Sequence, residues 1–393
     1  MRQITILKKD LKIYFLFIFL IFPFFRFTYL TFNFPLINKL YILWQIISFL
    51  GILICYFKRK ETYISNIIIH IIIYLLILNF STIINKASLI DCLYLSFKIL
   101  TLSLVVEYGI KFHKKIFIKT TANYLKMLVI INFISILFNP SGMYIDNIGY
   151  HQNWLLGYKN IHILFIIPAI MFDFIYSYYY ENKLNIKNYI FLIISYISII
   201  LVDSSTSLIG LTIILIFVIL NKIFIKLKIL NIKTYFATTV IAFFSLIIFR
   251  IQNYFQYFIV NILHRNINFT NRTYIWDYVI SFIKNKPLLG YGVENSFVRY
   301  NKTLYYQSFH AHNQILEIIY KSGFIGLISF IIIIIMSIRQ LYENKDNIIS
   351  KMLSIILFSY FVMMLTEVYS YEYFIFILVV CYNIKNLVKE SEK

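Results

Sequence analysis

Apolar runs of membrane-spanning length recur along most of this 393-residue chain. Hydrophobic residues make up 60% of the sequence and charged residues only 14%, so few positions interrupt the runs. A run of roughly 20 apolar residues crosses a bilayer as a helix, because backbone groups in hydrocarbon must bond within their own segment. A lipid-facing strand would alternate polar and apolar residues, which disfavours a β-barrel. The sequence therefore predicts an all-α polytopic membrane protein.

Twelve segments are candidate transmembrane helices, and a polar stretch of about sixty residues separates the ninth from the tenth. The predicted spans are 13–30, 36–57, 63–80, 89–110, 118–138, 161–180, 187–204, 208–227, 234–250, 313–338, 350–367 and 371–387. This pattern divides the chain into an N-terminal bundle over 1–250, an extramembrane loop over 251–312 and C-terminal helices over 313–393. The turn at 203–207 is so short that the two spans beside it could be misassigned.

Lysine and arginine are distributed unevenly between alternate loops. One set of loops, which includes both termini, carries 23 of them, whereas the short loops opposite carry only Lys39, Lys86 and Lys159. Because cytoplasmic loops are rich in basic residues, both termini are expected in the cytoplasm, with the long loop on the outer face of the cytoplasmic membrane. The net charge of +20 is then mostly a topology signal, and a nucleic-acid partner is not expected.

The first span follows basic residues but precedes no small-residue cleavage site, so a retained helix is expected rather than a signal peptide. The three cysteines, Cys55, Cys92 and Cys381, are scattered along the chain. This spacing predicts neither a disulfide framework nor a metal cluster, and the carboxylates are too dispersed to indicate a required divalent ion. No cofactor is therefore expected.

One helix is predicted inside the long polar loop. Asn271 suits an N-cap, the apolar residues Trp276, Val279 and Ile283 then recur at helical spacing, and Pro287 ends the pattern. Such a stripe is typical of an amphipathic helix that lies on a membrane surface, here the outer one.

Arg272 would occupy the first turn of this helix. Free backbone N–H groups at a helix start favour an anion, and a guanidinium adds paired donors that match phosphate oxygens. A lipid diphosphate could therefore bind here. The alternative is a contact with ordinary lipid headgroups or with a nearby carboxylate such as Asp277.

His312 lies where the long loop meets the tenth span. Asn313 follows it, and Gly323 and Gly326 are expected about two turns deeper on the same helix, where they would permit close helix packing. An imidazole with its ordinary pKa can accept a proton at neutral pH, so His312 is a candidate general base for a membrane-bound substrate.

Two neighbouring polar residues have open interpretations. His310 could bind an acceptor sugar or be an ordinary exposed loop histidine. Glu317 falls inside the predicted span, where a carboxylate could belong to the acceptor site or bond to another helix.

The order and spacing of these residues resemble a known family. Arg272 with Trp276, then the run Pro-Leu-Leu-Gly-Tyr-Gly at 287–292, then His312-Asn313 followed after nine residues by Gly323 and Gly326, look like the signature of the O-antigen ligase and Wzy-type polysaccharide polymerase superfamily. Twelve spans with a large late loop match that family's architecture. The run Gly-Tyr-Lys-Asn at 157–160, which contains Lys159, is similar to a weaker family segment.

This resemblance implies glycosyl transfer from a polyprenyl-diphosphate-linked oligosaccharide, making capsular polysaccharide or O-antigen. His312 would then be the base, and Arg272 would stabilise the departing diphosphate. Candidate substrate-binding residues are Asn313, Glu317, Arg265, Arg299, Gly290, Gly292 and Lys159. Membrane lipid, a chain-length regulator and a flippase would be partners.

One family feature is absent. Many relatives, ligases especially, carry a Ser-Arg pair before the large loop, whereas residues 204–208 here read Ser-Ser-Thr-Ser-Leu. Arg250, Arg265 or Arg299 could supply the missing cation. This departure favours a polymerase over a ligase that transfers finished glycan to another acceptor. A transporter for the same lipids is the alternative from another class, although the sequence has no paired broken helices in two related halves.

Overall fold

The computed structural model describes residues 2–59, 64–145, 151–220, 231–257, 260–261, 271–302 and 310–388. Most of these residues are in helices, and their strands form one small three-stranded sheet, which confirms the all-α fold class of a polytopic membrane protein. The helices of the first half are α1 (Arg2–Ile21), α2 (Thr28–Asn33), α3 (Pro35–Phe57), α4 (Asn66–Ile84), α5 (Leu89–Phe112), α6 (Lys114–Phe138), α7 (Ile163–Glu181), α8 (Ile186–Leu201) and α9 (Ser205–Ile219).

The second half begins with α11 (Ile232–Phe243), which continues as a π-turn over Phe244–Ile248 and a 3₁₀ turn over Ile251–Phe255. The remaining helices are α12 (Arg272–Asn285), α13 (Ser296–Lys302), α14 (Gln314–Glu343), α15 (Ile348–Met363), α16 (Tyr371–Tyr382) and α17 (Ile384–Val388).

A small antiparallel sheet follows α6 and precedes α7. It consists of β1 (Tyr144–Ile145), β2 (Gln152–Trp154) and β3 (Gly157–Tyr158), with β2 in the middle. The loop around it is tied to the bundle, because the Trp154 indole donates to the carbonyl of Asn139 at 2.8 Å.

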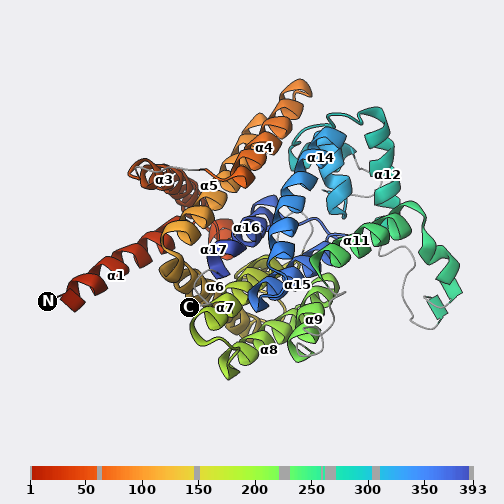
Figure 1. Ribbon diagram of the computed structural model, residues 1–393. Helices are drawn as coiled ribbons and strands as arrows, with labels where there is room; N and C mark the ends of the chain where they lie inside the picture. Colours follow the sequence, from red (N-terminus) through yellow and green to blue (C-terminus); the bar gives the residue numbers. More distant parts are fainter. Residues whose placement is uncertain are drawn as a thin grey trace.

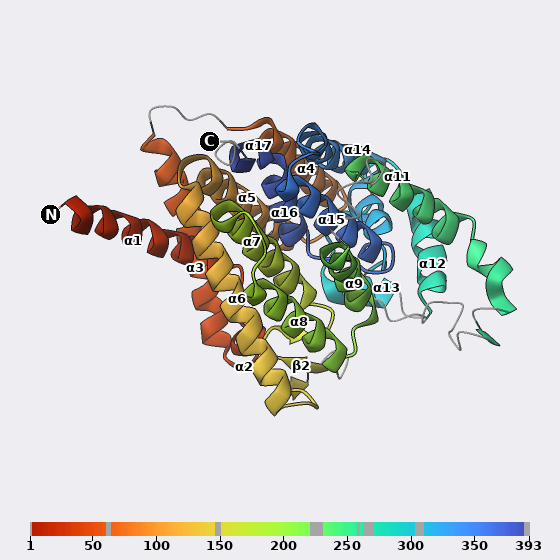
Figure 2. The same cartoon turned by 60° about the horizontal axis from the view of Figure 1, so that its bottom comes forward.

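The C-terminal helices form the centre of the bundle. Helix α16 is almost wholly buried and packs against α5, α14 and α15, while α4 lies along α14 (Figure 1). Helices α6, α7 and α8 lie side by side on another flank (Figure 2). Many apolar side chains on α3, α4 and α8 face outward, as expected where lipid replaces water.

Six described helices are long and apolar enough to cross a membrane, namely α3, α4, α5, α6, α7 and α14. Five shorter apolar helices accompany them: Ile186–Leu201, Ser205–Ile219, Ile232–Ile248, Ile348–Met363 and Tyr371–Tyr382. The short turn near Asp203 separates α8 from α9, so these spans are two helices. The total of twelve spans and the division into three regions stay predictions.

The first predicted span was misplaced. It was expected to run through residue 30, but α1 ends at Ile21, and α2 begins only at Thr28. Pro23 explains the stop, because proline has no N–H to donate and disfavours helical geometry in the residue before it.

The amphipathic helix is present, but its surroundings differ from the prediction. Trp276, Val279 and Ile283 on α12 are buried against Leu316 and other residues of α14 and of the turn after α11. The stripe therefore faces protein rather than a membrane surface. Asn271 is the N-cap residue, as predicted, but it has a positive φ of 67° and its side chain makes no capping hydrogen bond.

Helix α14 is not the continuous helix that was predicted. His312 lies before its start, with a φ of 47°, and Gly323 interrupts it with φ 63° and ψ −171°. Gly323 and Gly326 are therefore not simply two turns deeper on one regular helix with His312. The physical reason lies in the loop at 287–292, described below.

Candidate active site

Asn313 fixes the start of α14 beside the end of α15. Its side-chain oxygen accepts a hydrogen bond from the backbone N–H of Leu316 at 2.9 Å, and its amide nitrogen donates to the carbonyl of Leu365 at 2.9 Å. Asn313 is fully buried. It therefore joins two segments of the chain, and the contact with substrate predicted for it stays a prediction.

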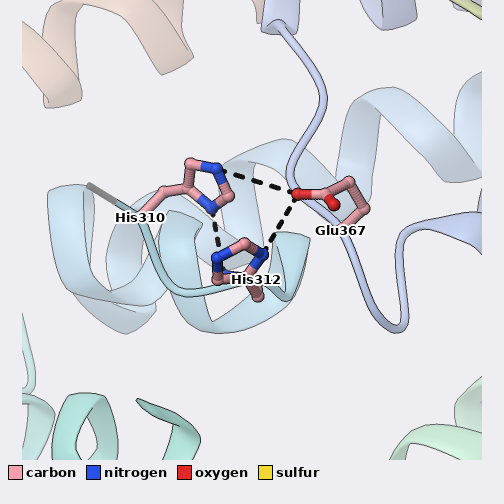
Figure 3. A group of neighbouring side chains, drawn as sticks. All are labelled: His310, His312 and Glu367. Carbon is pink, nitrogen blue, oxygen red and sulfur yellow. Dashed lines mark hydrogen bonds and ion pairs between the residues drawn. The ribbon is translucent and has the colours of Figure 1, made fainter. Parts of the chain in front are cut away.

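His310, His312 and Glu367 meet at this junction. Nδ1 of His312 lies 3.3 Å from Oε1 of Glu367, and Nε2 of His310 lies 3.7 Å from the same oxygen. Figure 3 shows the three side chains pointing toward one another, the histidines from the segment before α14 and the carboxylate from the turn between α15 and α16. The sequence prediction found His312 and considered His310, but it missed Glu367.

Glu367 is a buried carboxylate with several donors. Oε2 accepts from Arg272 and from the Asn160 amide, both at 3.1 Å, and Oε1 accepts from the N–H of Val368 at 3.1 Å. Burial by itself opposes the charge, but the interaction with His312 and the nearby cations hold the pKa of Glu367 well below its usual range, at about 2. Glu367 is therefore ionised at neutral pH.

The position of Glu367 indicates which ring nitrogen of His312 is available. Because Nδ1 faces the carboxylate of Glu367, the proton of a neutral His312 is favoured on Nδ1, and Nε2 keeps its lone pair. The backbone of His312 is held as well, since its carbonyl accepts from the Trp276 indole at 3.2 Å. Its side chain is 27% exposed, so a substrate can reach it.

His310 is neutral at pH 7 beside His312. Burial, and then the neighbouring His312, lower the pKa of His310 to about 4. Its Nδ1 accepts from the backbone N–H of His312 at 3.2 Å, which favours the tautomer protonated on Nε2. His310 thus supports the backbone of His312, in addition to either role considered from the sequence.

Arg272 is the first residue of α12, and it contacts Glu367 instead of Asp277. Asp277 pairs with Arg250, whose Nη2 lies 2.5 Å from the carboxylate oxygen and 3.2 Å from the carbonyl of Thr273. Arg250 also lies over the Trp276 ring, 5.2 Å from its centroid. Arg250, one of the three arginines considered as replacements for the missing family arginine, therefore lies against α12. It also contacts Trp276, the residue whose indole holds the carbonyl of His312.

Arg299 and Glu317 belong to a buried network. Oε2 of Glu317 accepts from the backbone N–H of Ala311 at 2.9 Å and lies 3.4 Å from Arg299. Its Oε1 lies 2.9 Å from Lys321. Because Ala311 stands between the two histidines, Glu317 holds the loop that carries them. The substrate contacts predicted for Arg299 and Glu317 stay predictions, and both side chains already face protein partners.

Gly290 and Gly292 belong to the loop over 287–292, which is hydrogen-bonded to α14 next to the break at Gly323. The N–H of Tyr291 donates to the carbonyl of Tyr320 at 2.7 Å, and the N–H of Gly292 donates to that of Lys321 at 2.9 Å. Both glycines have positive φ, and a Cβ on Gly290 would lie 2.4 Å from the Tyr320 carbonyl oxygen. These glycines therefore allow close backbone contact, and their predicted binding role stays a prediction.

Lys159 lies near the site without entering the cluster. Its Nζ donates to the carbonyl of Asp203 at 2.8 Å, and its neighbour Asn160 reaches Glu367. Arg265 lies outside the described residues. Glu367 had a sequence signal of its own, because it is a carboxylate at the end of a predicted span and at the same membrane boundary as His312.

The ligand atoms of His310, His312 and Glu367 lie within 4.8 Å of one another, a spacing that could hold a metal ion. However, the Arg272 guanidinium already occupies one oxygen of Glu367 and would repel a divalent cation. The donor set therefore suits proton transfer better than metal binding.

An apolar groove leads away from this cluster. Its empty volume is about 1340 Å³, and it runs along α14 from Gln314 to Ile334 between α11, α12 and α15. Gln314 directly follows Asn313, and Leu365, also in its lining, is two residues from Glu367. The groove therefore begins beside the charged cluster and continues along a hydrophobic wall.

Part of the chain that contains most of these site residues is similar to known proteins. Residues 190–331 match the family described as O-antigen ligase, a range that includes Arg272, His312 and Glu317 but ends before Glu367. A protein of Rickettsia conorii named "Putative polysaccharide ligase" is 34% identical over 88 residues, covering 19% of this chain and 21% of its own. A protein of Rickettsia felis with the same description is 34% identical over 87 residues, covering 20% and 21%.

The aligned segment thus spans about a fifth of the length of these relatives. Over residues 190–331 the match covers α8, α9, α11, α12 and the first part of α14, which include the Arg272 helix and the His312 junction. The family resemblance indicated by the sequence motifs is therefore confirmed over residues 190–331, where this membrane protein is similar to the O-antigen ligase family.

Proposed function

We propose that this protein transfers a glycan from a polyprenyl-diphosphate carrier to an acceptor hydroxyl at the outer face of the cytoplasmic membrane. The observation that carries the proposal is the position of His312, Glu367 and Arg272 at the head of an apolar groove. A base, a cation and a hydrophobic channel are what a lipid diphosphate donor requires.

The groove suits the isoprenoid part of the donor. It is lined almost entirely by apolar side chains of α11, α14 and α15, and it passes under the buried face of α12. Since Arg272 begins α12, a lipid tail in the groove would leave its diphosphate near the guanidinium and the helix start. Arg250, which contacts Thr273, would be the second cation.

In the proposed reaction the acceptor oxygen attacks the anomeric carbon while the bond from that carbon to the diphosphate oxygen breaks. Nε2 of His312 takes the acceptor proton, and Glu367 stabilises the resulting imidazolium through Nδ1. Arg272 stabilises the negative charge on the leaving diphosphate. Its contact with Glu367 uses only part of its five N–H donors, so it can bind both groups.

The orientation of this site rests on the charge pattern. By the positive-inside rule, the basic residues of alternate predicted loops assign these loops and both termini to the cytoplasm, and the loop that leads to His312 to the other side. The site would then face the outside, where a flippase delivers lipid-linked glycans and a chain-length regulator acts on them.

The acceptor separates two versions of the activity. The absence of the Ser-Arg pair near Ser205 favours a polymerase that extends a second lipid-linked repeat unit. The relatives named as polysaccharide ligases favour transfer of a finished glycan to a different acceptor. Both versions need the same base and the same leaving group, so His312 and Arg272 would serve either one.

The proposal is tested with purified protein and a lipid-linked repeat unit, without nucleotide and with EDTA present. A ladder of products identifies a polymerase, whereas transfer only after a second acceptor is added identifies a ligase. His312→Ala and Arg272→Ala should each reduce turnover by about 100-fold or more, the usual contribution of a general base or a charge-stabilising donor. Normal turnover in His312→Ala would refute the assigned base, and lipid movement across vesicles without transfer would indicate a transporter.

A further inference from the structure

A second charged cluster lies beside the first turn of α16 and is separate from the cluster of His310, His312 and Glu367. Nζ of Lys98 lies 2.6 Å from Oε1 of Glu372. Lys98 is on α5, nine residues after its start, which corresponds to roughly 14 Å along the helix axis. A cation inside an apolar helix is costly and usually marks a functional position.

A second ion pair in the same bundle, between Lys126 and Asp173, can be compared with the pair of Lys98 and Glu372. Nζ of Lys126 on α6 lies 2.5 Å from Oδ1 of Asp173 on α7, and the Asn188 amide donates to Oδ2 of Asp173 at 2.7 Å. One cation faces one carboxylate, and both carboxylate oxygens have donors. This closed arrangement needs no ligand, because it joins α6, α7 and α8 by itself.

The cluster at Lys98 is not closed in this way. Among the described residues, the buried Oε2 of Glu372 has no hydrogen-bond partner, and the same holds for the buried Nη1 of Arg26. Arg26 donates through Nη2 to Asn38 at 3.3 Å and lies close enough to Lys98 to repel its charge. Within the described part of the chain, Glu372 pairs with Lys98, whereas Arg26 has no carboxylate partner, which leaves an excess positive charge and an unused guanidinium donor.

The surroundings indicate the kind of anion that fits. Arg26 lies over the Tyr41 ring at 4.8 Å, and Lys98 lies 5.0 Å from the Tyr94 ring centroid. The Trp44 ring stacks in the same aromatic group as Tyr41. Tyrosine and tryptophan gather at the headgroup level of a bilayer, and Glu372 lies in the first turn of α16, which the long Lys98 side chain reaches from inside α5. The anion that fits beside this helix end is therefore a lipid phosphate.

The distance to the candidate active site is short. Glu372 follows Glu367 by five residues, so their Cα atoms are at most about 18 Å apart even along a fully extended chain. A lipid whose phosphate binds at Arg26 and Lys98 could therefore extend a glycan of a few sugars to His312.

We propose that Arg26 and Lys98 form a second lipid-phosphate site and that its occupant is the acceptor lipid of the transfer reaction. The assignment to the acceptor rests on the proposed function, whereas phosphate binding does not. Glu372 holds Lys98 in position, and the free donor of Arg26 completes the contact with the phosphate.

The first test measures binding by the full chain in neutral detergent. The thermal midpoint of wild type should rise with phosphatidylglycerol but not with diacylglycerol, which has the same tails and no phosphate. Arg26→Gln should lose most of that rise; it breaks no carboxylate pair, so the variant should fold. An equal rise in wild type and in the variant would overturn the phosphate site, even if the protein has no transferase activity.

The second test measures initial rates against acceptor-lipid concentration at saturating donor. Arg26→Gln and the paired change Lys98→Met with Glu372→Gln should raise the acceptor KM by about tenfold and leave the donor KM unchanged. The control is Lys126→Met with Asp173→Asn, which should change neither constant. An unchanged acceptor KM in an active enzyme would overturn the acceptor assignment and leave ordinary phospholipid as the occupant, whereas an inactive wild type would refute the proposed function instead.

Discussion

At the scale of single residues, Glu367 gives His312 a defined chemical state. Its carboxylate faces Nδ1 of His312 and is held by Arg272, Asn160 and the backbone N–H of Val368. This arrangement favours the proton on Nδ1 and leaves the lone pair of Nε2 available to an acceptor hydroxyl in the proposed reaction. Without Glu367, the imidazole would lose both its orientation and the stabilisation of its protonated form.

Glu367→Gln should therefore lower kcat by at least about tenfold. Complete loss of a general base lowers the rate by a factor of about 10² to 10⁴. The acceptor KM should change by less than about twofold, because the amide keeps the size and position of the side chain. Glu367→Asp should recover part of the rate, because it restores the charge. Equal kcat values for wild type and Glu367→Gln in a reconstituted transfer assay would show that Glu367 does not act through His312.

His310 and Glu367 should both make the protein less stable as the pH falls, each in its own pH window. An unfolded histidine takes up a proton near pH 6.5, but folded His310 does so only near pH 4, so stability falls as the pH drops between these values. The stabilisation from Glu367 persists in that range and is lost between about pH 4.5 and 2.

His310→Gln should accordingly flatten the decline of the thermal midpoint between pH 6.5 and 4. The measurement is a thermal unfolding series in detergent, and His151→Gln, which changes an exposed histidine, is the matched control. A decline of the same steepness in His310→Gln and wild type would contradict the assigned protonation state.

At the scale of elements, the break in α14 and the loop over 287–292 depend on each other. The N–H of Phe324 donates to the carbonyl of Pro287 at 2.8 Å, so the loop supplies hydrogen bonds that a regular helix would make internally. Gly323 lies in a region of φ and ψ that is essentially restricted to glycine. The loop and the break together fix the first turns of α14, which carry Glu317 and the groove wall.

Gly323→Ala should strongly destabilise the protein. Its Cβ would lie 2.0 Å from the carbonyl oxygen of Leu288, a backbone atom that cannot move aside. Gly51→Ala in α3 is the control, because its Cβ would meet only Leu20 at 3.6 Å, and alanine favours a helix over glycine by about 1 kcal/mol. We expect a lower thermal midpoint or loss of folded yield for Gly323→Ala and no loss for Gly51→Ala. Equal yields and midpoints for the two variants would contradict the close backbone contact between the 287–292 loop and Gly323.

At the scale of the whole molecule, the site end and the basic end of the bundle lie on opposite sides of the membrane in the proposed topology. Ser141 is exposed in the turn after α6, near the sheet that leads to Asn160, and Asp346 is exposed between α14 and α15. In a chain whose three cysteines are replaced by alanine, a membrane-impermeant maleimide added to intact cells should label Ser141→Cys and leave Asp346→Cys unlabelled. The reverse pattern would refute the assignment of the site to the outer face.

The all-α class and most helix positions could be predicted from the sequence, because runs of apolar residues in a bilayer permit few other structures. The start of α12 at Arg272 was also predictable from its periodic stripe. The end of α1 at Ile21 was missed because the apolar run continues past Pro23, and the break at Gly323 was missed because its cause is a loop more than thirty residues earlier in the chain.

Sequence alone determined the membrane class and the family resemblance and made His312 and Arg272 candidate site residues, because these depend on local composition and on the order of short motifs. Only the tertiary structure decided that Glu367 joins both residues, that the stripe of α12 faces protein, and that Arg299 and Glu317 hold the histidine loop. Those contacts join segments that lie far apart along the chain. Their geometry follows from how the helices pack, which no local pattern of residues records.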